Sequence, residues 1–143
     1  MKKSARTIHV SVDGWQFQCC GELGAVGDAV EWRLLFLPES ADGPGRPGGP
    51  GQPGEWHFFG EPLVLPHVRP KDAPTILRAD GVTAYWRRSS RFARGWDLRG
   101  TLHEDHHGAV PGEVPPTRGR IRSITPLPGG EDLRVEIAVD PPA

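Results

Sequence analysis

Two groups of side chains in this 143-residue chain have the types and spacing that metal ligation or proton transfer requires. Cys19 and Cys20 are adjacent thiols, and residues 103–107 hold three of the six histidines. Cysteine thiolate and histidine imidazole are the ligands that Zn²⁺ prefers in tetrahedral sites. One hypothesis is therefore a structural zinc site that draws its ligands from Cys19, Cys20, His103, His106 and His107.

A second hypothesis gives this cysteine and histidine set a catalytic role. Three ligands and an open coordination position would activate a water molecule, with Glu104 as the general base of a metal-dependent hydrolase. Glu104 or Asp105 would alternatively orient a ligating imidazole through a hydrogen bond. The spacing matches neither HExxH nor a paired CxxC signature. The ordinary alternative is a solvated polar turn and a buried thiol, so we favour a non-catalytic protein over an enzyme.

A third candidate region is basic and aromatic. Residues 86–96 place four arginines among three aromatic side chains, and a later predicted strand carries further arginines on one face. Guanidinium groups bind phosphate and aromatic rings stack on unpaired bases, so the region could bind single-stranded nucleic acid or a protein. The alternative is a solvated sheet edge whose aromatic side chains lie in the core. The arginines concerned are Arg87, Arg88, Arg91, Arg94, Arg120 and Arg122.

Composition limits the class of protein. The length suits one domain over residues 1–143, and a net charge of −1 argues against a dedicated nucleic-acid binder. No apolar run is long enough to span a bilayer, and the basic start lacks the apolar stretch of a signal peptide. Two cysteines in a chain without a leader favour the cytoplasm. We therefore expect a cytoplasmic binding or interaction module, whose partner is most simply another protein.

Strand patterns dominate the chain and predict an all-β fold. About eight short segments alternate apolar and polar residues between turns, which is typical of a small antiparallel barrel or sandwich. Residues 29–37 form the longest expected strand, and residues 76–87 form a hairpin around Asp80-Gly81. Strands at 119–125 and 133–139 should pair across a glycine turn. The segment 38–54 holds 11 glycines or prolines in 17 residues, which predicts a flexible hairpin insertion.

Several motifs together resemble a known family. They are Trp15-Gln16-x-x-Cys19-Cys20-Gly21, Val26-Gly27-Asp28-x-Val30-x-Trp32 and His103-x-x-His106-His107-Gly108. The chain is similar to a family of small, uncharacterised actinobacterial proteins that carry these motifs. The resemblance covers nearly the whole chain except the glycine- and proline-rich segment. It implies an actinobacterial cytoplasmic origin and one domain, with the thiol pair and the histidines as parts of one recurring design.

Overall fold

The computed structural model describes residues 6–13, 25–38, 54–90, 92–105, 108–126 and 132–140. These residues form nine strands and one 3₁₀ helix, so the predicted all-β class is confirmed. None of their helical segments is long and apolar enough to cross a membrane. In chain order the elements are β1 (Thr7–Asp13), β2 (Ala29–Trp32), β3 (Leu34–Pro38), β4 (Gly54–Pro62), η1 (Pro70–Asp72), β5 (Thr75–Ala79), β6 (Val82–Trp86), β7 (Arg94–Glu104), β8 (Thr117–Pro126) and β9 (Asp132–Val139).

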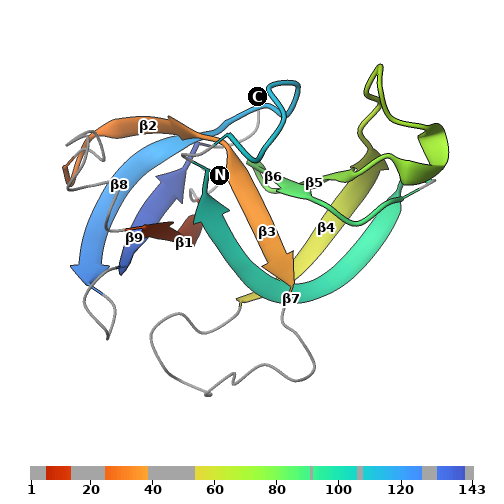
Figure 1. The fold of residues 1–143 in the computed structure, drawn as a ribbon. Coiled ribbons are helices and arrows are strands. Elements are labelled where there is room, and N and C mark those ends of the chain that lie inside the picture. The colour runs from red at the N-terminus through yellow and green to blue at the C-terminus, as the bar shows by residue number, and fades with distance from the viewer. Residues whose placement is uncertain are drawn as a thin grey trace.

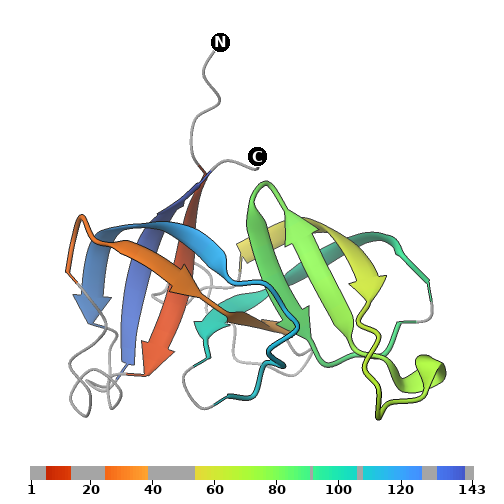
Figure 2. The ribbon, with the colours of Figure 1, turned by 90° about the horizontal axis from the view of Figure 1, so that it is seen from above.

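Five of the strands close a barrel. Strand β7 pairs with β4, β4 with β5 and β5 with β6, which is the antiparallel Greek-key order. Strand β3 then joins β6 to the other edge of β7 and completes the ring. The strands β1, β9, β8 and β2 continue the sheet outside the barrel, as the two lobes in Figures 1 and 2 show.

The pairing differs in two respects from the predicted antiparallel arrangement. Strands β1 and β7 pair in parallel, and so do β3 and β6. Parallel pairing requires a crossover connection, and each of these pairs is separated in the chain by other strands. The predicted strand 29–37 is also interrupted at Arg33, because β2 pairs with β8 whereas β3 pairs with β6 and β7.

The two predicted hairpins are confirmed. Asp80 and Gly81 have φ angles of 45° and 88°, the left-handed conformation that a two-residue turn between right-twisted strands needs. Strands β5 and β6 pair on either side of this turn, and β8 pairs with β9. The apolar run Leu63-Val64-Leu65 also predicts a strand, which is not formed. The alternation at residues 15–19 predicts another, which falls outside the described residues.

Strand β7 fixes where the predicted insertion leaves the barrel. Pro38, at the end of β3, and Gly54, at the start of β4, both lie opposite Gly100 of β7. The chain therefore leaves and re-enters the barrel on opposite edges of β7 at Gly100. Strands β3 and β4 pair with β7 and not with each other, so the flanking strands do not form the predicted hairpin. Residues 39–53 themselves are outside the described part of the structure.

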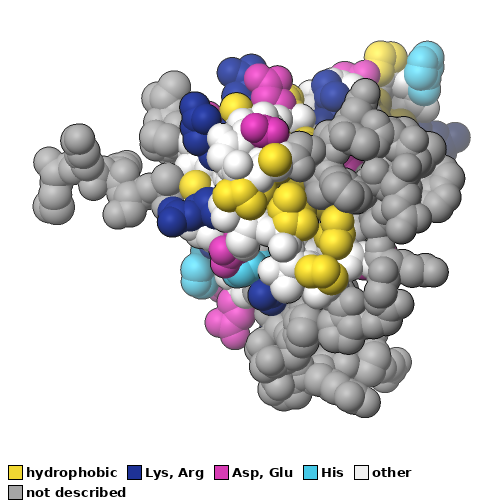
Figure 3. All heavy atoms as spheres, turned by 90° about the vertical axis from the view of Figure 1, so that its left-hand side faces the viewer, with side chains coloured by type: hydrophobic (Ala, Val, Ile, Leu, Met, Phe, Trp, Pro, Cys, Tyr) yellow, Lys and Arg dark blue, Asp and Glu magenta, His cyan; other side chains and the backbone are white. Residues whose placement is uncertain are grey.

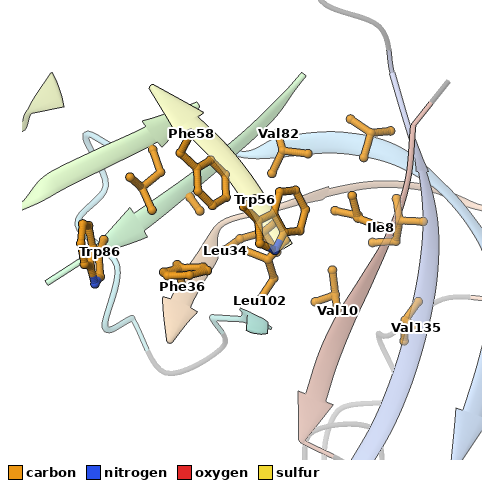
Figure 4. Close-up of a cluster of buried hydrophobic side chains, with 14 of the residues drawn as sticks. Ile8, Val10, Leu34, Phe36, Trp56, Phe58, Val82, Trp86, Leu102 and Val135 are labelled. Carbon is orange, nitrogen blue, oxygen red and sulfur yellow. The ribbon is translucent and has the colours of Figure 1, made fainter. Parts of the chain in front are cut away.

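One hydrophobic core extends through the barrel and the outer strands. Its buried side chains come from β1 and from β3 to β9, and Figure 4 shows how those of the barrel meet those of β1 and β9. Phe36 packs edge-on against Phe58, with ring centroids 5.5 Å apart, and Trp56 stacks on Phe58 at 4.9 Å. Trp56 and Trp86 are also buried in this core.

The substitution Gly100→Ala should destabilise the protein. A β-carbon at this position would contact the carbonyl oxygen of Leu37 and lie 2.6 Å from Cζ of Phe36. Overpacking of this kind typically costs about 1–3 kcal/mol. Urea denaturation should show that loss in the free energy of unfolding.

The control is Gly95→Ala in the same strand, where a β-carbon would meet no atom within 4 Å. Its free energy of unfolding should be unchanged or raised by up to about 1 kcal/mol. Equal stability of the two variants would contradict the close approach at Gly100.

Candidate functional site

The two regions that the sequence singled out lie at opposite ends of β7. Arg94 is the first residue of this strand, whereas His103 and Glu104 are the last two. Nine residues at about 3.3 Å each separate Arg94 from His103 by roughly 30 Å along the strand. In Figures 1 and 2 the two ends of β7 are correspondingly far apart. His103 and Arg94 therefore lie far apart in the structure.

His103 lies half-buried on the outer face of the sheet. Its backbone is opposite Ser11 of β1 and Leu35 of β3. Its ring nitrogen Nε2 lies 2.8 Å from the Thr101 hydroxyl, within hydrogen-bond distance. Burial lowers the pKa of His103 below its usual 6.5, and the negative charge of Asp132 acts weakly in the opposite direction. The imidazole is therefore predominantly neutral near pH 7.

The two carboxylates next to His103 are directed elsewhere. Because side chains alternate along a strand, Glu104 lies on the opposite face of β7 from His103. Asp105 accepts hydrogen bonds from the backbone N–H groups of Ala109 and Val110, at 2.9 and 2.8 Å. Its carboxylate thus orders the loop that follows β7.

The other four members of the predicted zinc set fall outside the described residues. These are Cys19, Cys20, His106 and His107. Among the residues that the structure describes, no group of three or more His, Cys, Asp or Glu side chains could hold a metal ion. Zinc ligation by this set stays a prediction.

At the other end of β7, two arginines stack on tryptophans. Cζ of Arg94 lies 3.5 Å from the centroid of the Trp96 ring, and Cζ of Arg88 lies 5.1 Å from the same centroid. Arg88 also lies 5.4 Å from the centroid of Trp86, whose ring meets Trp96 edge-on at 5.1 Å. The two guanidinium carbons can thus be no further apart than the sum of their distances to Trp96. Both arginines are exposed, so this end of the barrel has a basic surface.

A third arginine that contacts a tryptophan shows what is unusual about this cluster. Cζ of Arg6 lies 4.3 Å from the ring centroid of Trp56, and its guanidinium also forms an ion pair with Asp80 at 3.1 Å. Among the described residues, no carboxylate lies within 4.0 Å of the Arg88 or Arg94 guanidinium. The segment 81–96 contains four arginines and no acidic residue. Two like charges are therefore held close together without a counter-charge from the described chain.

The indole N–H of Trp96 does not belong to the exposed surface. Nε1 is buried and has no hydrogen-bond partner in the described part of the chain. A β-carbon built on Gly60 would lie 2.9 Å from this atom, so this edge of the indole lies against the backbone of β4. The ring of Trp96 supports the arginines, while its N–H faces inward.

The remaining arginines of the hypothesis lie elsewhere. Burial raises the pKa of Tyr85, and the positive charge of Arg87 offsets part of this rise. Arg91 is outside the described residues. Arg120 donates a hydrogen bond to the carbonyl oxygen of Gly27 at 3.2 Å, and Arg122 lies at an irregularity in β8.

The surface of β8 differs in charge pattern from the barrel end. Arg118, next to Arg120 on this strand's outer face, pairs with Glu31 of β2 at 3.2 Å. Figure 3 shows this side of the molecule, where basic, acidic and hydrophobic side chains are intermixed. Figures 1 and 2 place β8 and the β6–β7 connection on opposite sides of the molecule. The structure therefore brings Arg88 and Arg94 together but does not bring Arg120 or Arg122 to them.

Sequence reasoning missed one exposed aromatic residue on the face of β4 and β7 opposite to Arg94 and Trp96. Phe59 is 52% exposed on β4 and lies opposite Gly95, the residue after Arg94. The alternation of residues 56–59 contained the signal, because burial of Trp56 and Phe58 directs Phe59 to the outer face. On the same face the imidazole of His57 contacts the carboxylate of Asp97.

Comparison with known proteins identifies a family but no function. A model described as a family of unknown function, DUF6578, matches residues 6–132. The resemblance to an uncharacterised family is thereby confirmed. No curated protein and no solved structure matches the chain.

His103 should contribute to loss of stability in acid. Because its folded-state pKa is lowered, the unfolded chain binds the proton more readily, and folding loses stability as pH falls below about 6.5. A His103→Gln variant should lose less stability than the parent between pH 7 and 5, measured by urea denaturation at each pH.

The control Thr101→Val removes the hydrogen-bond partner and keeps the titrating imidazole. It should retain the acid-dependent loss of stability. An identical pH profile for the parent and His103→Gln would show that His103 does not titrate differently in the folded and unfolded states.

Proposed function

We propose that this chain, which belongs to the family of unknown function DUF6578, is a non-catalytic binding module that captures an anionic partner at the end of its barrel. We define the basic end as the surface formed by Arg88, Arg94 and Phe92, supported by Trp86 and Trp96. The observation that supports this proposal is the pair of guanidinium groups on one indole with no carboxylate partner in the described chain.

An anion between the two guanidinium groups would relieve their mutual repulsion. For exposed charges in water this repulsion is small, about 1 kcal/mol at a separation of 4 Å. A phosphate or carboxylate between them would replace repulsion with charge-assisted hydrogen bonds, each worth about 1.5–3 kcal/mol. Stacking on tryptophan leaves the in-plane N–H groups of each arginine free to donate to such an anion.

The backbone that carries these arginines is held in place. The Thr75 hydroxyl donates a hydrogen bond to the carbonyl oxygen of Arg88 at 2.8 Å. The backbone N–H of Ser90 donates to Ala73 at 3.0 Å, and its hydroxyl donates to the carbonyl oxygen of Phe92 at 2.8 Å. A surface ordered before binding loses less conformational entropy when it binds. These bonds therefore favour a binding role for the loop over a passive connection.

The proposal extends the expectations from the sequence. A protein partner was the simplest expectation and nucleic acid the alternative, and both can present anionic groups. We also propose that the module works in an actinobacterial cytoplasm, which is consistent with two cysteines kept as thiols. Zinc at the cysteine and histidine set would be structural and separate from the basic end.

Anion binding should depend on Arg88 and Arg94. The double variant Arg88→Ala/Arg94→Ala should bind inorganic polyphosphate at least about tenfold more weakly than the parent, because two charge-assisted contacts are lost. Isothermal titration calorimetry at low ionic strength measures this change. Circular dichroism should show that the β-structure is retained.

The matched control is Arg122→Ala, which removes the same charge from the other side of the molecule. Its polyphosphate affinity should stay within about twofold of the parent, because exposed charges far apart are screened by salt. Equal losses in the control and the double variant would mean that only net charge matters. That result would contradict a site at the basic end.

A further inference from the structure

We propose that the anionic partner of the basic end is single-stranded nucleic acid, with phosphates bound by Arg88 and Arg94 and a base stacked on Phe92. This inference rests on the proposed anion-binding function and specifies its ligand class. It combines the two guanidinium groups with one exposed aromatic ring, which lies two residues before Arg94 in the chain.

Phe92 is exposed for no reason that the core explains. It is 75% exposed, whereas Phe36 and Phe58 are almost fully buried. Exposed aromatic rings cost hydration free energy that a stacking ligand would recover. Aromatic side chains beside a positive surface are the usual components of sites for unpaired bases.

The position of this ring suits a base next to a bound phosphate. Phe92 is two residues before Arg94, so their Cα atoms are at most about 7 Å apart. Phe59 does not contribute to this surface, because it lies opposite Gly95 and its side chain is on the other face of the sheet from Arg94 and Trp96. A strand bound here would place a phosphate near Arg94 and a neighbouring base on Phe92.

The charges around this surface favour a chain of phosphates over an isolated anion. Arg69 and Lys71 are exposed at η1, which is joined to the β6–β7 connection through the Ser90–Ala73 hydrogen bond. On the other side, Arg78 pairs with Glu61 at 2.8 Å and His57 contacts Asp97. Exposed arginine and lysine side chains therefore continue from Arg94 toward η1, which also carries the exposed Asp72, and paired charges border them on β4 and β5.

The barrel itself is compatible with this ligand. Five-stranded Greek-key barrels include a class that binds oligonucleotides on its strands and loops. This likeness concerns architecture alone, and fold does not fix function. Nucleic acid is favoured by the two arginines together with Phe92. An acidic peptide would satisfy the arginines but would leave the exposed ring without a planar partner.

The test compares three probes of similar length on the full chain. They are oligothymidylate of about 12 nucleotides, an abasic oligomer with the same phosphates, and a poly-glutamate peptide. Fluorescence anisotropy should show tighter binding of oligothymidylate than of the other two. Phe92→Ala should weaken oligothymidylate binding roughly tenfold or more and leave abasic binding unchanged. The control Val26→Ala truncates an exposed hydrophobic side chain on the other side of the molecule and should change neither affinity.

Salt dependence separates the phosphate contacts from the stacking contacts. Each lost phosphate contact should reduce the slope of log affinity against log salt by about 0.7 for a single strand. Arg88→Ala should reduce this slope, whereas Phe92→Ala should lower affinity without changing it. Arg94→Lys keeps the charge and should retain the slope, while losing affinity through the weaker stacking and the loss of paired donors.

The outcomes distinguish this inference from the function on which it rests. Equal binding of oligothymidylate and the abasic oligomer, with no effect of Phe92→Ala, would overturn nucleic acid as the ligand and leave a general anion site. Preference for poly-glutamate would also overturn it, in favour of an acidic protein partner. If Arg88→Ala and Arg94→Lys change the binding of no probe, the anion site itself is wrong.

Discussion

The fold depends on one strand that three others share. Strand β7 pairs with β4 along its first half, with β3 along its second half, and with β1 near its end. This closes the barrel and attaches the outer strands. Strand β3 approaches Gly100 so closely that a larger side chain does not fit at this position. The same strand also separates the two chemically distinctive regions, because Arg94 and His103 are at its two ends. Whatever each region binds, the sheet prevents them from forming one site.

Arginines stacked on tryptophans occur in two places with different electrostatics. At Trp56 the cation is neutralised by Asp80, so the contact is complete within the protein. At Trp96 two cations share one indole, and no carboxylate of the described residues neutralises either. Cation–π contacts contribute about 0.5–2 kcal/mol each, so both arrangements support the barrel. Only the second also offers unpaired donors to a ligand. This contrast within one molecule is why we assign binding to the basic end and a structural role to Arg6.

Much of the fold could be predicted from local patterns, whereas the site could be predicted only in part. The alternation in β1, β8 and β9 and the Asp80-Gly81 turn specify strands and hairpins through interactions between near neighbours. The parallel pairings and the break at Arg33 depend on how distant strands meet, which local alternation does not encode.

The run 86–96 indicated a basic aromatic surface, and Arg88 and Arg94 do come together there. Arg120 and Arg122 share its charge but lie on another lobe, because side-chain type says nothing about tertiary position. Phe59 was missed because its neighbours in the sequence belong to the core.

The most direct test of the account is an NMR titration of the ¹⁵N-labelled protein with oligothymidylate, following the side-chain Nε–H signals of arginine and the indole signals of tryptophan. The account predicts that Arg88 and Arg94 shift first and saturate together, and that the indole of Trp96 shifts with them because it supports both guanidinium groups. Arg6, which is already paired with Asp80, should remain unchanged. Shifts confined to Arg120 and Arg122, or no saturable shift at any arginine, would contradict binding at the basic end.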